Sequence, residues 1–440
     1  MDRQGHIRHR LPDEWRVDSF ENIAVFRIGR TPTRNVKTWW ESPDYPWVSI
    51  SDMTPFGVIQ STAQSISQAA HDKVFKGNLV PAGYTLMSFK LTIGRVARLG
   101  IPAHHNEAII SFVPNPAVVD QSYLEFYLSQ IDYASYRDKA IKGDTLNKSK
   151  INTLMIALPP IDEQRQIARV LSAVHRAIER QERLIALTAD LKKALMHKLF
   201  TEGTRGEPLK ETEIGPVPET WDKVPLGTVV DLFNGLAFKS EDAVSKSNTQ
   251  LVRMGNLYSN RLDLARSPLF YPDNFADKYQ RFILHEGDLI MSLTGTSGKE
   301  DFGFVVERDE TSRTLLLNQR VVKSTPTSSK LLKEYLLFFL QSRKFLDHLY
   351  PTAKGMKQAN LSTNAMRKLL LVIPDIAEQR QIANCFRTLD AKLELHRQTH
   401  LALSDLFRTL LHQLMTARIR VHDLDLSALD ELVPEAAEVA

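Results

Sequence analysis

The chain has 440 residues, 43% of them hydrophobic and 25% charged, a composition typical of a soluble globular protein of two or three domains. The formal net charge of +4 combines an acidic tail, in which residues 417–440 carry two basic and six acidic side chains, with a mildly basic remainder. That balance permits nucleic-acid binding without requiring it. A single cysteine, Cys385, excludes an internal disulfide, and no segment is apolar for long enough to span a bilayer. We therefore expect a cytoplasmic protein.

An internal repeat organises the chain. The sequence Glu-Gln-Arg-Gln-Ile-Ala at residues 163–168 returns at residues 378–383, an offset of 215 residues. Both copies follow a proline and carry acidic residues where a helix would begin, which is a typical helix start. Because no proline interrupts residues 161–207 or 376–433, each copy predicts a helix of about 40 residues, roughly 60 Å long. The long helices are placed at 159–202 and 374–416.

Apolar residues recur along both predicted helices at spacings of three and four, as in coiled coils. Two similar seams in one chain favour pairing of the helices with each other, although each could instead pack on its own domain. Gln181 and His396 stand at equivalent positions where the seam turns polar, either setting the register or facing solvent. The positions predicted for helix pairing or partner docking are Ile167, Leu171, Val174, Ile178, Leu191, Leu195, Ile382, Phe386, Leu389, Leu393, Leu406 and Leu410.

The remaining segments also occur twice and in the same order. Each half has a Gly-containing loop, two strand-like runs, a segment led by asparagine, an apolar helix, a Lys-Gly pair and a last apolar strand. Each half is large enough for its own core. The predicted segments are a first domain at 1–158 that includes an N-terminal arm at 1–14, the helix 159–202, a linker rich in Gly, Pro and Glu at 203–218, a second domain at 219–373, the helix 374–416 and an acidic tail at 417–440.

This order, with Glu-Gln-Arg-Gln-Ile-Ala opening a long helix twice, resembles the specificity subunit of type I restriction–modification systems over nearly the whole chain. The resemblance implies a mixed α+β fold in which two similar target recognition domains are separated by two long helices that form an antiparallel coiled coil. Each domain would read one half of a split DNA target, and the helices would fix the unread gap. Methyltransferase and restriction subunits would be the partners, and S-adenosylmethionine, ATP and Mg would bind to them rather than to this chain.

Motifs for catalysis are incomplete. The run Gly295-Thr296-Ser297-Gly298-Lys299 lacks the first glycine and the final Ser or Thr of a P-loop. Asp375 and Asp390 have a nuclease-like spacing, but on one helix they would lie about 22 Å apart, too far to share a metal ion. The run His104-His105-Asn106-Glu107 offers metal-binding side chains without a recognised spacing, and a surface or core-edge turn is the favoured interpretation. We expect no catalytic and no metal-binding residues in this chain.

Lys and Arg side chains in or beside repeated loops are the candidate DNA contacts, because such side chains bind phosphates and reach base edges. For any one of them an ordinary solvated charge is the alternative. Trp39 and Trp40 would either contact DNA or pack internally. Two further functions stay open, a coiled-coil scaffold without DNA readout and an enzyme in its own right. The candidate DNA-binding residues are Arg30, Arg34, Lys37, Lys90, Arg95, Lys142, Lys239, Arg253, Lys299, Arg320, Lys354 and Lys357.

Overall fold

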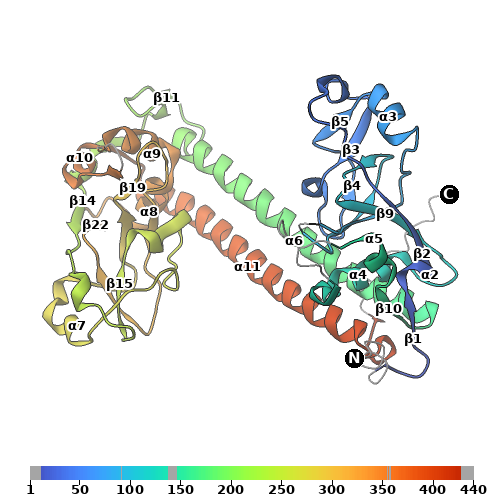
Figure 1. The fold of residues 1–440 in the computed structure, drawn as a ribbon. Coiled ribbons are helices and arrows are strands. Elements are labelled where there is room, and N and C mark those ends of the chain that lie inside the picture. The colour runs from blue at the N-terminus through green and yellow to red at the C-terminus, as the bar shows by residue number, and fades with distance from the viewer. Residues whose placement is uncertain (1–10, 91, 137–145, 354, 356–357, 428–440) are drawn as a thin grey trace. The chain divides into compact units, whose positions relative to one another are not determined.

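The computed structural model describes residues 11–90, 92–136, 146–353, 355 and 358–427. Contacts divide the chain into two compact units, residues 1–182 with 398–440, and residues 183–397. Each unit combines one domain of strands and helices with one half of each long helix (Figure 1). The units therefore differ from the predicted linear segments, because each long helix contributes to both of them.

The domain of unit 1 contains two main sheets and a short strand pair. The five-stranded sheet has the order β2-β9-β6-β7-β4, and the three-stranded sheet has the order β5-β3-β8, in which β3 and β8 are parallel. Strand β1 pairs with β10, the last strand before the long helix. The elements are β1 (Arg16–Ser19), α2 (Phe20–Ile23), β2 (Ala24–Ile28), β3 (Tyr45–Val48), β4 (Val58–Ile59), β5 (Gln64–Ile66), α3 (Gln68–Phe75), β6 (Thr85–Ser88), β7 (Val96–Leu99), β8 (His104–His105), β9 (Ile109–Pro114), α4 (Gln121–Gln130), α5 (Lys148–Asn152) and β10 (Met155–Leu158).

The domain of unit 2 has a related topology, with one strand fewer in the first sheet and one more in the second. Its sheets have the orders β14-β22-β18-β20 and β16-β15-β21-β17, β15 and β21 are parallel, and β13 pairs with β24. A further strand pair joins β19 to β23. The elements are β13 (Asp222–Pro225), β14 (Val230–Asn234), β15 (Thr249–Val252), β16 (Phe270–Tyr271), α7 (Asn274–Lys278), β17 (Ile283–Leu284), β18 (Leu289–Ser292), β19 (Thr294–Thr296), β20 (Val305–Glu307), β21 (Thr314–Leu317), β22 (Val321–Pro326), α8 (Lys333–Gln341), α9 (Arg343–Leu349), β23 (Gln358–Asn360), α10 (Thr363–Lys368) and β24 (Leu370–Ile373).

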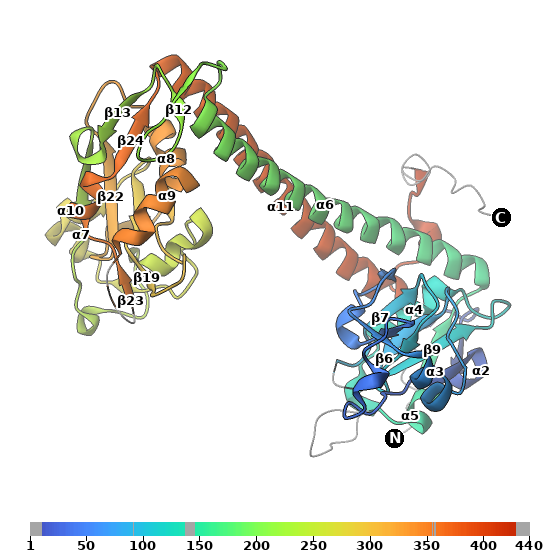
Figure 2. The same ribbon diagram turned by 90° about the horizontal axis from the view of Figure 1, so that it is seen from above.

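The long helices are α6 (Ile161–Glu202) and α11 (Ile376–Met415), and they run antiparallel (Figure 2). In unit 1 the first half of α6 lies against the second half of α11, where the ring of Phe407 lies 5.8 Å from that of His175. In unit 2 the end of α6 meets the start of α11, where the rings of Phe200 and Phe386 stack 5.7 Å apart. The strands and helices of both units confirm the mixed fold, and these contacts confirm the antiparallel helix pairing.

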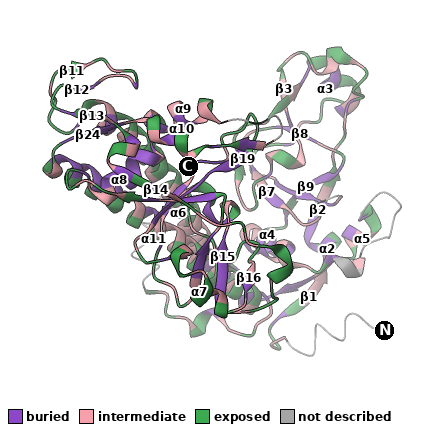
Figure 3. Ribbon diagram, turned by 90° about the vertical axis from the view of Figure 1, so that its left-hand side faces the viewer, coloured by how far each residue is buried: buried purple, intermediate pink, exposed green. Residues whose placement is uncertain are grey.

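Figure 3 shows buried strands such as β15 inside the domains. Most of the predicted pairing positions on the long helices are buried or partly buried. Ile167, Leu171, Ile382, Phe386, Leu389 and Leu393 are buried, and Val174, Ile178, Leu195 and Leu410 are partly buried. Leu191 and Leu406 differ, because their side chains are 50% and 45% exposed. They are therefore not buried in the helix–helix seam as the other predicted positions are.

The repeated glutamate ties each domain to the long helices. The Glu163 carboxylate accepts a hydrogen bond from the indole N–H of Trp15 at 3.2 Å, and Arg420 donates to both of its oxygens at 2.8 and 2.9 Å. The carboxylate of Glu378 likewise accepts from the Trp221 indole at 3.1 Å and from the Thr204 amide at 2.7 Å. Each glutamate therefore binds the first tryptophan of its own domain to the segment that follows the other long helix.

The repeated glutamine also connects each domain to the start of the long helix that follows it. Gln164 accepts from the Asp120 amide at 2.8 Å and donates to the Pro159 carbonyl at 2.9 Å. Gln379 accepts from the Leu332 amide and donates to the Pro374 carbonyl, both at 2.8 Å. Since both side chains are buried, these bonds satisfy polar groups that water does not reach. The identical residues of the repeat thus make corresponding contacts, a tryptophan indole for each glutamate and a backbone amide and carbonyl for each glutamine.

Two segments predicted as peripheral are folded where the structure describes them. Residues 203–218 contain the strand pair β11 (Leu209–Lys210) and β12 (Val217–Pro218), and Val217 is buried in the core of unit 2. In the tail, Val421 is buried in the core of unit 1. Leu11 of the N-terminal arm packs against the same core, while residues 1–10 and 428–440 lie outside the described residues.

Candidate nucleic-acid interface

In each domain, a glycine allows an equivalent loop to approach a neighbouring backbone segment closely. Gly29 directly follows β2, and a Cβ built on it would lie 2.2 Å from the carbonyl oxygens of His105 and Asn106. A Cβ on Gly235 would lie 2.2 Å from the carbonyl oxygen of Asn318. Only glycine permits so close an approach of two backbones. The first loop is thereby fixed against the end of β8, and its counterpart against the end of β21.

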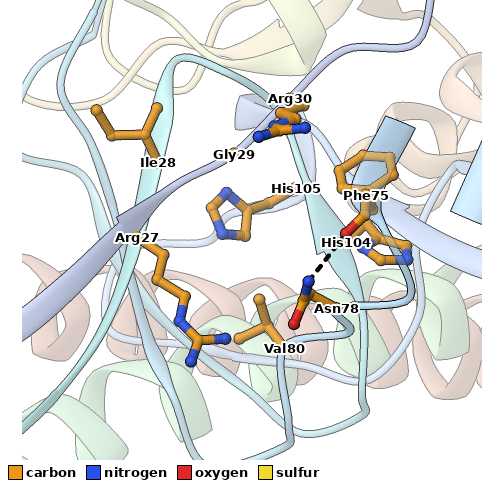
Figure 4. A pocket seen from close by; sticks show the side chains of 9 residues that line it. All are labelled: Arg27, Ile28, Gly29, Arg30, Phe75, Asn78, Val80, His104 and His105. Atoms are coloured by element: carbon orange, nitrogen blue, oxygen red, sulfur yellow. Dashed lines mark hydrogen bonds between the residues drawn. The ribbon is translucent and has the colours of Figure 1, made fainter. Parts of the chain in front are cut away.

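The loop at Gly29 borders the first hollow, a cavity of about 320 Å³ (Figure 4). Arg27 and Arg30 lie on its rim with Asn78, His104 and His105 in its wall. The Arg30 guanidinium donates to the Val74 carbonyl at 2.6 Å, which fixes its position while leaving it exposed. Burial lowers the pKa of both histidines to about 4, so the positive charge here belongs to the two arginines.

The two histidines of β8 belong to the interior. Nε2 of His104 lies 2.8 Å from Nδ1 of His71, and the ring of Phe75 stacks on His104 with centroids 3.9 Å apart. Both His104 and His105 are buried. Among the residues that the structure describes, no three His, Cys, Asp or Glu side chains gather as a metal ion would need. The expectation of a surface or core-edge turn is therefore wrong for the two histidines, which lie in a buried strand.

A second hollow of unit 1, about 420 Å³, lies beside β5. The Arg34 guanidinium lies over the Trp40 ring, 3.7 Å from its centroid, and Nη2 donates to Oε1 of Gln64 at 2.9 Å. Glu41 also lines the hollow. Trp40 is thus packed beneath an arginine and is itself half-buried.

Unit 2 has an arginine-lined hollow of about 510 Å³. Arg253 and Arg320, predicted separately from distant parts of the sequence, both line it together with Arg266. The Arg253 guanidinium donates to the Ser267 carbonyl, and the Arg266 guanidinium lies 4.8 Å from the centre of the Tyr258 ring. Asn318 and Gln319 add amide groups to the same wall, whereas the amide of Asn256 is buried and bonded to the carbonyls of Asp263 and Arg266. The hollow therefore offers hydrogen-bond donors and acceptors beside a concentrated positive charge.

The other predicted contacts are dispersed. Lys37 and Lys299 are exposed, and Lys239 forms an exposed ion pair with Glu241 at 3.2 Å. Lys90 is half-buried beside the Phe89 ring. Lys142, Lys354 and Lys357 lie outside the described residues.

Arg95 is held by its own domain. Its guanidinium donates to the Ile50 carbonyl at 3.1 Å, a bond that ties the segment before β7 to the loop after β3. Sequence reasoning missed Arg27, Gln64 and Arg266. Only Arg27 carried a signal, since it lies two residues before the repeated glycine.

The P-loop-like run forms a turn closed by a carboxylate. The Asp301 side chain accepts from the Thr296 amide and hydroxyl, both at 2.7 Å, so an acidic group occupies donors that a phosphate would need. Asp375 pairs with Arg205, and Asp390 pairs with Lys192 at 2.6 Å.

In the described part of the chain, no helix has the length and apolar character needed to cross a membrane.

Comparison with known proteins identifies relatives over most of the chain. The family model described as type I restriction modification DNA specificity domain matches residues 12–189 and again 218–404. The specificity subunit of the type I restriction enzyme MjaVIII from Methanocaldococcus jannaschii is 25% identical over 425 residues, covering 94% of this chain and 95% of that protein. The MjaIX specificity subunit of the same organism is 22% identical, covering 94% and 96%.

Two solved structures share the fold. The type I restriction–modification S subunit from M. genitalium aligns with a TM-score of 0.57 at 13% identity, covering 90% of this chain and 95% of that one. A chain from a solved type I R-M system aligns with a TM-score of 0.52 at 15% identity, covering 92% and 98%.

Proposed function

Because the chain belongs to the type I restriction–modification DNA specificity family, we propose that each of its two domains reads one half of a split DNA target. The observation that carries this proposal is the occurrence of two domains with related topology and an arginine-lined hollow in each. Guanidinium groups beside amide side chains suit both phosphates and base edges. The chain is the non-catalytic specificity subunit of such a system.

The paired helices would act as the spacer between the two readers. Each domain is fastened to the helices by a buried carboxylate that binds a tryptophan indole, Trp15 through Glu163 and Trp221 through Glu378. Two recognition domains joined by a stiff spacer bind one DNA duplex with a high effective concentration. They do so only when the distance and the helical phase between the two half-targets match those between the domains. The unread gap of the target would therefore follow from the length of the helices.

The helices would also carry the methyltransferase subunits. Large apolar side chains stay exposed on both of them, Leu191 and Leu395 in unit 2 and Leu401 and Leu406 in unit 1. Such leucines, repeated along both helices, are candidate contacts for a partner protein. Restriction subunits would join the same complex. S-adenosylmethionine, ATP and Mg would bind to these partners, which would supply the chemistry.

Salt dependence of DNA binding tests this proposal against a coiled-coil scaffold. The chain with its methyltransferase subunit is titrated with duplex DNA from 50 to 200 mM salt, conditions under which six or more phosphate contacts reduce affinity by about 10³-fold or more. We expect such a fall together with preference for one split sequence. Weak binding that hardly responds to salt would contradict DNA readout and favour the scaffold.

A further inference from the structure

Arg34 differs from the other candidate DNA contacts in how it is held. Of the nine that the structure describes, Arg34 is the one that is exposed, stacked on an aromatic ring and hydrogen-bonded to another side chain. Trp40 supports one face of the guanidinium at 3.7 Å, and Gln64 accepts from Nη2 at 2.9 Å. No carboxylate of a described residue forms an ion pair with it. The remaining N–H groups of the guanidinium are therefore free and already oriented.

Such an arrangement suits a base edge. A guanidinium reads guanine through two parallel hydrogen bonds to O6 and N7, which requires a fixed plane. Stacking on Trp40 and the bond to Gln64 fix that plane before DNA arrives, so less side-chain entropy is lost on binding. A fixed fork also suits two oxygens of a phosphate, so the choice between base and phosphate depends on the neighbouring side chain.

The neighbour of Arg34 in the hollow favours a base over a phosphate. Glu41 lines the same wall. Its carboxylate would repel a phosphate, whereas a carboxylate accepts readily from the N4 amino group of cytosine. Guanine acceptors and the cytosine amino group lie side by side on the major-groove edge of one G·C pair. The hollow thus presents the donors and the acceptor that such a pair complements.

We propose that Arg34 is a specificity-determining residue that reads the guanine of one G·C pair in the half-target of the first domain. Trp40 and Gln64 are positioning residues for it, and Glu41 favours the paired cytosine. This inference rests on the proposed function, since it presumes that the first domain reads DNA.

Binding to singly substituted targets tests the inference. The target is first identified as the sequence that the complex of this chain with its methyltransferase subunit methylates in cells. The affinity of the complex is then measured for duplexes with that sequence and for duplexes in which each base pair is replaced in turn. Replacing the contacted guanine should weaken binding of the unaltered complex by between about 5-fold and 150-fold. With Arg34→Ala, that replacement should cost less than about 2-fold, while replacements elsewhere keep their cost.

Two further variants separate reading from folding and from charge. Arg34→Lys keeps the positive charge but lacks the planar fork, so it should lose the same discrimination even if Arg34→Ala folds poorly. Lys37→Ala, at an exposed side chain three residues away, should weaken binding evenly over all duplexes. Gln64→Ala should reduce discrimination at the same base pair only.

Three outcomes would overturn the inference. Penalties that remain unchanged at every position in both Arg34 variants would assign Arg34 to phosphate binding or to structure. A target whose first-domain half contains no G·C pair would contradict it directly. An unaltered complex without any sequence preference would overturn the proposed function as well, which distinguishes the two failures.

Discussion

The joint between the first domain and the long helices depends on one carboxylate, and Glu163→Ala removes it. The substitution deprives the buried Trp15 indole of its acceptor at 3.2 Å and deprives Arg420 of both oxygens, at 2.8 and 2.9 Å. Removing one partner of a buried pair costs roughly 3–5 kcal/mol. Arg420 keeps its ion pair with the exposed Glu14 at 2.9 Å, so the lower end, about 3 kcal/mol, is expected.

Hydrogen exchange followed by mass spectrometry measures this loss unit by unit. A loss of about 3 kcal/mol corresponds to roughly 100-fold faster exchange of the most protected amides of unit 1. Unit 2, whose joint depends on Glu378, should be unchanged and serves as an internal reference. The matched control is Asp162→Ala, because that carboxylate lies next to Glu163 but is 85% exposed and, among the described residues, has its ion pair with Arg165 at 3.3 Å. An exposed pair contributes about 1 kcal/mol or less. Equal exchange in the two variants would refute the reasoning.

Three other changes have defined outcomes. Burial lowers the pKa of both His104 and His105 to about 4, so each binds more protons in the unfolded state once the pH falls below about 6.5. Unit 1 should lose about 2 kcal/mol for each histidine between pH 7 and pH 5, and His105→Leu should remove about half of that loss in urea unfolding. Deleting one heptad from both long helices shortens them by about 10 Å and should shorten the gap of the methylated motif by about three base pairs, with both halves of the motif unchanged. The double substitution Leu191→Asp and Leu406→Asp changes two exposed side chains, so the chain should still fold. In calorimetric titration it should bind its methyltransferase subunit at least about 10-fold more weakly. Unaltered affinity would contradict docking of that subunit on the helices.

The sequence predicted the large-scale organisation because that organisation depends on local and repeated patterns. Uninterrupted apolar spacing predicts long helices, and the observed α6 and α11 begin at Ile161 and Ile376, close to the predicted starts. The repeat also marked Glu163 and Gln164. It did not reveal their roles, because the Glu163 partners Trp15 and Arg420 lie 148 and 257 residues away.

Individual side chains escaped prediction for related physical reasons. An apolar position repeated every three or four residues predicts a stripe on a helix, but a single partner helix covers only part of that stripe, so Leu191 and Leu406 are exposed. A loop arginine is equally suited to DNA and to a nearby carbonyl, and Arg95 donates to the carbonyl of Ile50. The composition of residues 203–218 resembles a linker, yet Val217 is fully buried there.

Methylation-sensitive sequencing of DNA from cells that express this chain with its methyltransferase subunit tests the central claim most directly. Two short, defined blocks of sequence separated by a gap of fixed length are the predicted result, because two readers are joined by helices of fixed length. A motif made of one continuous block, or no new motif from a formed complex with an active methyltransferase, would contradict split recognition by this chain.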